Sequence, residues 1–463
     1  MKTSIQNSSF LAASEKVAFD EIHRDKIKFN ISRYDDAVEK GLNNYNNLDI
    51  AKNRAGFIKY KVINELDRYL IEFEDNFTSN GGKIIWAQDS EEALKEIIKL
   101  TQKHSINSAV KSKSMTTEEI ELNAAIEREG IDVVETDLGE FIVQQAGQKP
   151  YHIVTPAMHM SKEDVALLYN EKFGTPNDLT PEELTLYTRK LLREKFTNAE
   201  LGITGANFLI ADTGSIALTE NEGNGMLSMS FPKVHIAIAG IEKIIPKLEH
   251  LDLYWPLLAA HGTGQAMTVY NSIISGPRKN NEKDGPENMY VVLLDNGRTK
   301  LLKEERQRQA LSCIRCGACL NACPVYKNVG GHTYDTTYSG PIGSVITPYL
   351  QSIKKYKHLS FASSLCGKCT SVCPVNIPLH ELLLLNRNHS VKKGYYTFFE
   401  KQSINFSSRV LGSRKVLDVL SGNTKNKLIK LSIAKTWGPR RELPEIAPKS
   451  FNQLWKEKEI DDA

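Results

Sequence analysis

The sequence predicts an α/β domain built on a parallel sheet, followed by a smaller, mainly helical domain that carries all of the cysteines. The first part rests on short apolar segments that alternate with capped helices between residues 83 and 295. The second part rests on seven cysteines, which all fall between Cys313 and Cys373. Because 463 residues exceed what one hydrophobic core normally supports, we expect four segments: 1–75 (helical), 76–300 (α/β), 301–395 (cysteine-rich) and 396–463 (helical and extended tail).

Composition narrows the classes of function. Lys and Arg number 59 against 56 Asp and Glu, and the formal charge of +3 gives no support to binding of nucleic acid or of a membrane surface. The start of the chain lacks the apolar core of a signal peptide, and no later segment approaches the ~20 apolar residues of a membrane span. We therefore expect a cytoplasmic protein with no transmembrane segment, peripheral to the inner membrane only through partners.

The first 77 residues are expected to be helical and to serve packing. Between 51 and 77, apolar residues recur at spacings of three to five with charges between them, which is typical of a helix that buries one face. These residues are Phe57, Val62, Leu66, Tyr69, Leu70 and Phe73.

The α/β pattern begins near Gly82. Helices are predicted to begin at Ser90, at Thr116 with Glu119 completing a capping box, at Pro181 and near Ile241. Strand-like segments are predicted at 83–87, 108–112, 131–135, 206–219, 226–230, 234–240 and 290–295. Strands that alternate with helices favour a parallel sheet.

Several polar positions in this half are candidates for ligand binding. Lys111 and Lys113 follow a strand and precede a helix start, which favours an anion site, although a solvated basic loop fits equally well. Thr213 and Ser215 lie at a bend and offer hydroxyls to a ligand, or form a tight turn. Glu220 is the one carboxylate that we can name as a nucleophile, and its loop-like neighbourhood favours a structural role.

Two further features are interpreted as structural. Gly262 and Gly264 form a GxG that lacks a third glycine and a downstream acidic partner, so we reject a dinucleotide fingerprint. His235 lies within an apolar strand and is expected to be a satisfied strand histidine. No catalytic residue can be assigned from these patterns, and any hydride or flavin step is expected to belong to another chain.

The cysteines form two related motifs. The first follows C-x2-C-x2-C-x3-C-P, the spacing with which bacterial ferredoxins hold 4Fe-4S clusters, and it comprises Cys313, Cys316, Cys319, Cys323 and Pro324. The second repeats it with Cys366, Cys369, Cys373 and Pro374, but Ser363 stands where the first motif has Cys313. Disulfides are disfavoured in a chain without a secretory segment, and zinc sites usually take cysteines in pairs. The motifs therefore predict two iron–sulfur clusters, 4Fe-4S in type.

The segments around the motifs also carry expectations. Residues 298–308 are interpreted as a connecting helix, and the Gly-, Thr- and Tyr-rich insert between the motifs is expected to cover the clusters or to form a docking surface. An apolar helix after Pro378 is expected to pack behind the second cluster. Residues 442–455 are expected to form a Pro-containing tail that lies across a surface.

Taken together, several motifs resemble those of the lactate utilisation protein B family, the iron–sulfur subunits of a three-protein bacterial L-lactate oxidation system. They are KSKSMTTEEI, GITGANFLIADTGSIALTENEGNG, ISGPR, DGPENMYVVLLDNGR, CIRCGACLNACP, ASSLCGKCTSVCPVNIP and GPRRELPEIAPKSF, and the likeness runs from about residue 20 to the C-terminus. The resemblance implies that residues 70–300 form a lactate-utilisation domain similar in fold to the sugar-phosphate isomerase and CoA-transferase superfamily. It also implies oxidation of L-lactate to pyruvate in the cytoplasm, with partners resembling lactate utilisation proteins A and C.

The same resemblance implies a ligand set for each cluster. Cluster 1 would be held by Cys313, Cys316, Cys319 and Cys373. Cluster 2 would be held by Cys323, Cys366 and Cys369, with Ser363, Ser364 or water as the fourth ligand, or would convert to a 3Fe-4S form. Ser363 looks like a trait of the family.

We interpret the chain as an electron-transfer subunit that passes electrons through two clusters to an acceptor, a quinone or another protein. The alternative is an acyl- or sugar-phosphate-type enzyme in the α/β domain, with structural or regulatory clusters. A zinc-stabilised scaffold is disfavoured by the cysteine spacing.

Overall fold

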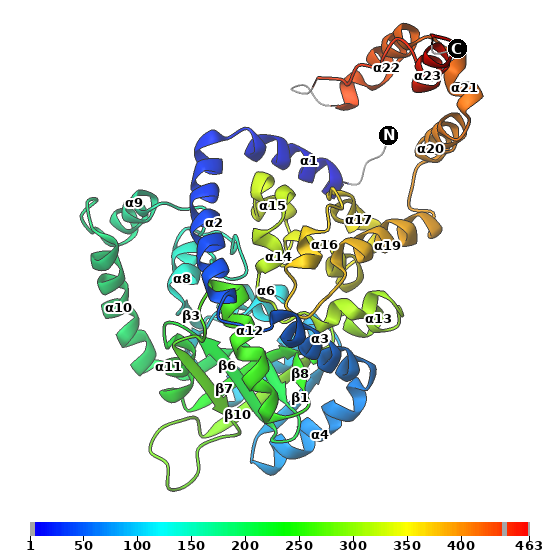
Figure 1. Cartoon of the computed structure of the whole chain (residues 1–463). Helices are drawn as coiled ribbons and strands as arrows, with labels where there is room; N and C mark the ends of the chain where they lie inside the picture. Colours follow the sequence, from blue (N-terminus) through cyan, green and yellow to red (C-terminus); the bar gives the residue numbers. More distant parts are fainter. Residues whose placement is uncertain (1–4, 438–441, 462–463) are drawn as a thin grey trace. The chain divides into compact units, whose positions relative to one another are not determined.

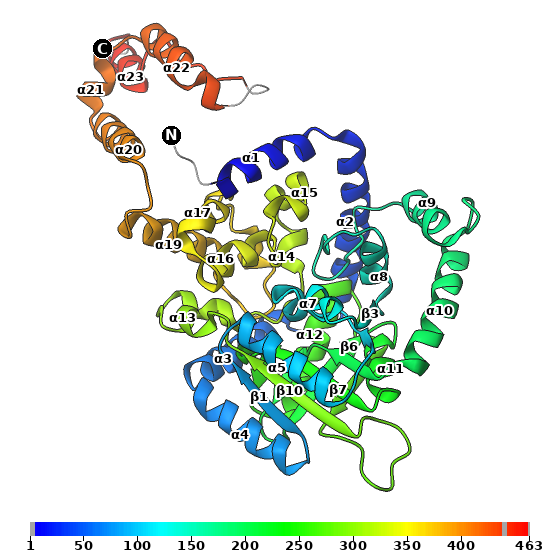
Figure 2. The ribbon, with the colours of Figure 1, turned by 180° about the vertical axis from the view of Figure 1, so that it is seen from behind.

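The computed structural model describes residues 5–437 and 442–461. The described residues form two compact units, one that reaches to Lys392 and one that begins at Lys393, and each is described by itself. Residues 1–4 of the predicted helical segment and residues 438–441 of the C-terminal motif lie outside the described residues. Figures 1 and 2 show the first unit from opposite sides, and its sheet and helices confirm the predicted fold class, a parallel α/β domain followed by a helical domain.

The N-terminal segment is helical, as predicted, wherever it is described. Its helices are α1 (Ile5–Ala18), α2 (Glu21–Leu42), α3 (Leu48–Asn64) and α4 (Leu66–Ser79). On α1, Phe10 packs on Tyr334 of the cysteine-rich domain. On α3, Lys52 Nζ donates a hydrogen bond to the backbone oxygen of Ser371, 2.8 Å away, beside the second cysteine motif. Since α4 instead buries its apolar face against the α/β domain, this segment joins the two domains.

The main sheet is parallel throughout and has six strands in the order β1-β10-β7-β4-β2-β3. These are β1 (Lys83–Ala87), β2 (Ser108–Lys111), β3 (Asp132–Glu135), β4 (Leu201–Thr204), β7 (Val234–Gly240) and β10 (Asn288–Leu294). Five of them match predicted segments; β4 is short and contains Gly202, so its sequence gives little strand signal.

Both faces of this sheet are covered. On β10, Tyr290, Val292 and Leu294 lie in a core that α5 (Ser90–Lys103) and α7 (Leu122–Arg128) help to form. Figure 2 shows α5 on this face of the sheet. The alternate residues Val291 and Leu293 lie in the core on the other side, which α4 helps to form. Burial on both faces explains why these strands are continuous apolar runs rather than alternating ones.

A second, mixed sheet lies beside the first in the order β8-β5-β6-β9. Its strands are β5 (Phe208–Ile210), β6 (Ser215–Glu220), β8 (Ile244–Ile245) and β9 (Tyr270–Ile274). The predicted bend near Thr213 is the turn of the antiparallel hairpin that β5 and β6 form. The sequence pattern does not distinguish these strands from those of the parallel sheet.

Three local predictions are wrong. Residues 226–230 are not a strand but lie in helix α11 (Asn224–Ser230), whose first amides donate to the Glu220 carboxylate. No long helix begins at Ile241; short turns η1 (Ile241–Lys243) and η2 (Leu248–His250) flank β8 and Pro246, and α12 (Leu251–Thr263) follows. The helix expected at Thr116 is α6 (Met115–Glu119), capped by Ser114, and Glu119 forms ion pairs instead of a capping box.

Three helices lie beyond the β3 edge of the sheet, as Figure 1 shows: α8 (Leu138–Gln145), α9 (Lys162–Phe173) and α10 (Pro181–Asn198). The predicted start at Pro181 is confirmed, with a capping box between Thr180 and Glu183. Rings of Phe141, Tyr169 and Phe173 pack together beneath them.

The cysteine-rich domain is built from short helices around one buried helix, α16 (Gly340–Leu350), in which every residue is buried. The others are α13 (Arg298–Leu302), η3 (Gln307–Ser312), α14 (Ala318–Asn321), α15 (Pro324–Val329), η4 (His332–Tyr334), α17 (Ile353–Phe361), α18 (Lys368–Ser371) and α19 (Leu379–Lys392). The insert between the motifs therefore forms the core of this domain. The helix predicted after Pro378 is α19, which contacts α16, α17 and α18.

The second unit contains α20 (Phe398–Leu411), α21 (Arg414–Val419), α22 (Gly422–Trp437) and α23 (Phe451–Asp461). Residues 442–450 are non-helical, and Asn426 holds them by two hydrogen bonds with the backbone of Ile446. The predicted tail thus lies along α22. Across the two described ranges, no helix is both long and apolar enough to cross a membrane.

Candidate functional site

The two cysteine motifs fold into two loops with nearly the same backbone. Gly317 has φ 80° and ψ −10°, and Gly367 has φ 79° and ψ −9°. Two residues before each glycine, Arg315 (φ 62°) and Leu365 (φ 55°) also adopt the left-handed conformation. A four-residue helix, α14 or α18, follows each glycine. The internal repeat seen in the sequence is therefore a repeat in structure.

The first loop and the end of the second surround one small apolar cavity, the first cysteine cavity. Four of its lining residues are Cys313, Cys316, Cys319 and Cys373. Backbone N–H groups point at the sulfurs: the N–H of Arg315 lies 3.4 Å from Cys313 Sγ, and that of Ile377 lies 3.3 Å from Cys373 Sγ. The structure thus brings together the four thiols that the resemblance assigned to cluster 1.

The second cysteine cavity is lined by Cys323, Cys366 and Cys369 together with Ser363 and Ser364. The N–H of Leu365 donates to Ser363 Oγ at 3.1 Å, as the N–H of Arg315 does to Cys313 Sγ in the first loop. Ser363 oxygen therefore occupies the place of a cysteine sulfur. In the first cavity Cys316, Cys319 and Cys373 are buried and Cys313 is half-buried, whereas Cys366 is exposed.

The donor groups of both cavities fit iron–sulfur clusters. All seven cysteines are free thiols. They lie in two groups, and each group includes one cysteine from the other loop: Cys373 joins the first group and Cys323 the second. Amide N–H groups directed at sulfur are the contacts that tune such clusters, and the apolar lining limits access of water.

A larger cavity of ≈ 400 Å³, the interdomain cavity, lies between the α/β domain and the first cysteine loop. It shares Ile153, Arg315 and Cys316 with the first cysteine cavity. Its other lining comes from the Ser112–Thr116 turn, β6, α12 and the loop around Glu222. A molecule in this cavity would therefore lie against the loop that carries Cys316.

The charged residues that line the interdomain cavity form two groups. Lys243 and Arg315 lie near each other on the side of the cysteine loop, and burial together with Arg315 lowers the pKa of Lys243 to about 8. Asp137, Glu220 and Glu222 form the other group with one basic residue, Lys113, near them, and burial and the Asp137 carboxylate raise the pKa of Glu222 to about 7. The cavity thus has a basic side and an acidic side.

An ion-pair network supports the basic side. The Arg298 guanidinium, with a side chain 1% exposed, donates to both oxygens of Glu119 at 2.9 Å and to Glu242 at 2.5 Å. Arg315 donates to the other oxygen of Glu242 at 3.3 Å and stacks on Tyr338. Although burial opposes ionisation, Arg298 and Arg315 lower the pKa of Glu242 to about 2. This network fixes the position of Arg315 beside the cysteines.

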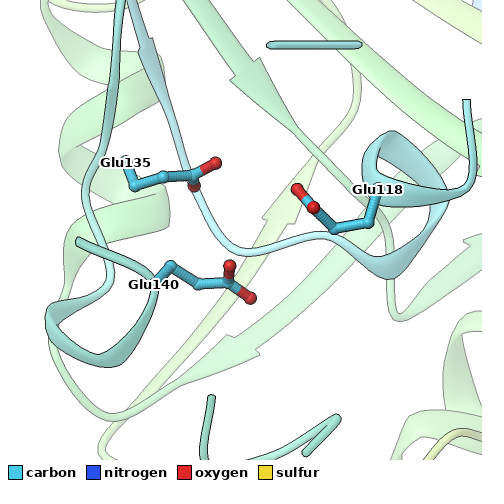
Figure 3. Close-up of side chains that lie close together, drawn as sticks. All are labelled: Glu118, Glu135 and Glu140. Atoms are coloured by element: carbon cyan, nitrogen blue, oxygen red, sulfur yellow. The ribbon is translucent and has the colours of Figure 1, made fainter. Parts of the chain in front are cut away.

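The two lysines of the predicted anion site do not lie in one site. Lys111 is fully buried, and its Nζ lies 2.7 Å from Glu135 and 3.1 Å from Glu118. Figure 3 shows these two carboxylates and that of Glu140 turned toward one another. Burial and the Glu135 carboxylate raise the pKa of Glu140 well above its ordinary value. Because Lys111 already supplies a positive charge and Glu140 holds its proton readily, this group is a buried ion-pair cluster, and Lys111 is not available to a ligand.

Of the other predicted site residues, some line the interdomain cavity and some do not. Lys113 lines the interdomain cavity and donates to the backbone oxygen of Val154 at 2.5 Å. Ser215 bonds Ser275 at 2.8 Å, on the hairpin turn with Thr213, and neither lines that cavity. Glu220 does line it, but its two oxygens accept hydrogen bonds from the backbone N–H groups of Gly225 and Met226. These bonds stabilise the start of α11, so the segment after Glu220 leads into a helix.

The residues interpreted as structural remain so. His235 Nε2 bonds Thr204 Oγ1 at 2.9 Å, and burial lowers its pKa to about 3, so the ring is neutral. Its buried Nδ1 has no partner among the described residues, so the expectation of a satisfied histidine holds for one ring nitrogen only. Gly264 ends α12 in the left-handed conformation, and a side chain there would meet the backbone of Ala37 in α2. Lys243, Arg298 and Arg315 were missed by sequence reasoning. The one local signal is the position of Arg315 inside the first motif.

Comparison with known families defines the class of protein. Residues 70–294 match the LUD domain family, and residues 309–377 match the 4Fe-4S dicluster domain family. The chain thus joins a LUD domain to an iron–sulfur domain whose cofactor fits the two groups of thiols. A crystal structure of a DUF162 family protein from Deinococcus radiodurans is also similar, with 15% identity and a TM-score of 0.29 over 50% of this chain and 98% of that one.

Individual relatives define the family. Lactate utilization protein B of Bacillus cytotoxicus is 44% identical over 411 residues, which cover 86% of each chain. The proteins of the same name from Bacillus cereus and Bacillus thuringiensis are 43% identical over the same length and the same share of each chain. The chain belongs to the lactate utilization protein B family.

Proposed function

We propose that this chain is the electron-transfer subunit of a system that oxidises L-lactate to pyruvate, with two 4Fe-4S clusters as carriers. The observation that carries the proposal is the pair of thiol groups, one of four cysteines and one of three, in a chain of this family. When bound, each cluster supplies a carrier that gains and loses one electron.

Each cluster site takes cysteines from both loops. Cys313, Cys316 and Cys319 of the first loop, with Cys373 of the second, would bind cluster 1. Cys366 and Cys369, with Cys323 of the first loop, would bind cluster 2, and Ser363 offers an oxygen at the position of the missing thiol. Because the fourth cysteine of each motif crosses over, the loops keep the two sites next to each other.

The burial of the two sites supports a direction of transfer. The first cysteine cavity is buried and adjoins the interdomain cavity, whereas the second has Ser364, Cys366 and Lys368 exposed at the surface. An acceptor, a protein or a quinone, reaches the exposed site more readily. Electrons therefore enter on the side of Cys316 and leave on the side of Cys366.

Other chains complete the system. The partners are proteins resembling lactate utilisation proteins A and C, which supply the removal of hydrogen from L-lactate. Their place is the cytoplasm, with contact to the inner membrane through partners.

The test is reconstitution. Anaerobically purified protein is assayed for iron and sulfide, and then for L-lactate-dependent reduction of its clusters, alone and with both partners. We expect cluster reduction only in the complete mixture. Sustained turnover of L-lactate by this chain alone with an artificial acceptor would contradict the carrier role.

A further inference from the structure

We propose that the interdomain cavity binds a small monocarboxylate, with the carboxylate group between Lys243 and Arg315. The choice of 2-hydroxy and 2-oxo acids as ligands rests on the proposed function, whereas the anion site itself is argued from the geometry of the cavity.

The first observation is that two basic side chains on one wall of the cavity, Lys243 and Arg315, have donor groups without partners. The Lys243 ammonium makes no hydrogen bond or ion pair with any described residue, although its side chain lies within the fold. Arg315 has a side chain 10% exposed, and its Nη1 is buried without a partner. A buried donor such as Arg315 Nη1 is costly unless a ligand or water satisfies it, and the half-buried Lys243 adds a second positive charge beside it. Two such cations on one wall of a cavity favour an anion.

The second observation is that the nearby carboxylates do not neutralise this wall. Glu119 and Glu242 lie beside four basic side chains, Arg298, Arg315, Lys243 and the buried Lys59, whose Nζ donates to the backbone oxygen of Glu242. Glu119 is fully engaged by Arg298, Asn296 and Tyr338. Lys243 is left without a carboxylate partner among the described residues, and a bound monocarboxylate would supply one.

The acidic side of the cavity selects against larger charge. Asp137, Glu220 and Glu222 line it with Lys113 as the one described cation near them, and the excess of carboxylates disfavours a dianion such as phosphate or a ligand with a second acidic group. Between the two sides, Asn207, Thr219 and Thr268 offer polar groups to a hydroxyl or keto oxygen. The cavity of ≈ 400 Å³ easily holds a molecule of three or four carbons, so a small monocarboxylate fits in charge and in polarity.

The proposed anion site lies next to the first cysteine cavity, so a bound anion would affect the first cluster. Arg315 stands between Cys313 and Cys316 in the chain, and its backbone N–H lies 3.4 Å from Cys313 Sγ. Cys316 itself lines both cavities. Negative charge bound at Arg315 therefore changes the electrostatic surroundings of the first cysteine cavity and leaves those of the second nearly unchanged.

The test measures binding to the cluster-loaded protein. Equilibrium dialysis with labelled L-lactate and pyruvate is run on the wild type, on Lys243→Gln and on Lys247→Gln, a control at an exposed lysine paired only with Glu249. We expect saturable binding of at least one acid, about tenfold weaker in Lys243→Gln, since one charge-assisted contact is lost, and unchanged in the control. Equal iron content in the three proteins shows that the variants are folded and loaded.

A spectroscopic measurement separates this site from nonspecific binding. In low-temperature EPR of the reduced protein, the acid should alter the signal that Cys373→Ala abolishes and leave the other signal unchanged. Absence of saturable binding, equal weakening in Lys247→Gln, or tighter binding of inorganic phosphate than of either acid would overturn the proposal. If neither acid binds while the reconstituted system still reduces the clusters, this inference fails and the proposed function stands. If an acid binds but the complete system never reduces the clusters, the proposed function fails and the site stands.

Discussion

The two cysteine loops share one backbone and differ in what surrounds it. Around the first loop lie four thiols, the Arg298 ion-pair network and the segment from His152 to Val154. Around the second lie three thiols, a serine hydroxyl and solvent. Duplication of a loop therefore fixes the spacing of the ligands, whereas the neighbouring domain decides which copy is buried and which one reaches the surface.

The largest effect is expected from removal of one cysteine from each cavity. Cys373→Ala should abolish the EPR signal of the first site and Cys369→Ala that of the second, each with a loss of roughly half of the bound iron, because two four-iron sites contribute equally. Both variants should lose L-lactate-dependent transfer to the final acceptor. If the two variants lost the same signal, the division of the cysteines into two groups would be incorrect.

The Arg298 network should matter for stability far more than a surface ion pair does. Arg298→Met leaves Glu119 and Glu242 buried without their main partner, so we expect a loss of about 3–5 kcal/mol in the free energy of unfolding. Arg306→Met removes an exposed pair with Glu381 and should cost about 0–1 kcal/mol. Anaerobic urea denaturation of the cluster-loaded proteins compares them, and equal midpoints would argue against a supporting role of the network.

Because of Ser363, one iron of the second site is expected to be held less firmly than the others. Oxygen ligands hold iron less firmly than thiolate in this kind of site, so mild oxidation should remove about one iron per protein from the second site. Ser363→Cys should protect that iron, because the N–H of Leu365 already points at the side-chain atom of residue 363. EPR and iron assays follow the conversion. Two sites of equal resistance in the wild type, unchanged in the variant, would refute a special role for Ser363.

The smallest effect is expected from alanine substitutions at the two loop glycines, Gly317 and Gly367, whose surroundings differ. Alanine at either position adopts an unfavourable left-handed backbone, at a cost of about 1–2 kcal/mol. At Gly317 the added carbon would also lie 2.9 Å from Val154 Cγ2, while at Gly367 it meets nothing within 4 Å. Gly317→Ala should therefore be the less stable variant, by about 1 kcal/mol or more. Thermal unfolding of both variants measures the difference, and equal melting temperatures would show that Val154 yields to the added carbon.

The sequence was most informative where structure is local. Ligands spaced by two or three residues, as in Cys313 to Cys323, define a loop without reference to the rest of the chain. Continuous apolar runs such as Tyr290 to Leu294 similarly indicate a strand buried on both faces.

It was least informative where residues meet through the fold. Lys243 follows β7 and Arg298 follows β10, and the neighbouring positions of these two strands in the parallel sheet bring both residues to the first cysteine loop. Nothing in the sequence near Lys243 indicates an interdomain cavity. Lys111 shows the reverse case: its position before a helix start favours an anion site, but the three glutamates that surround it come from α6, β3 and α8.

The contact between α3 and the second cysteine loop bears on how the protein is made. Lys52 and Ser371, which this contact joins, are 319 residues apart in the chain. At synthesis rates of about 5–20 residues per second, the ribosome needs roughly 15 to 60 s to produce the second partner after the first. During that interval α3 has no cysteine loop to pack against. The first helices to leave the ribosome thus close over the last cysteines, and iron delivered before that closure reaches loops that are still open on the α3 side.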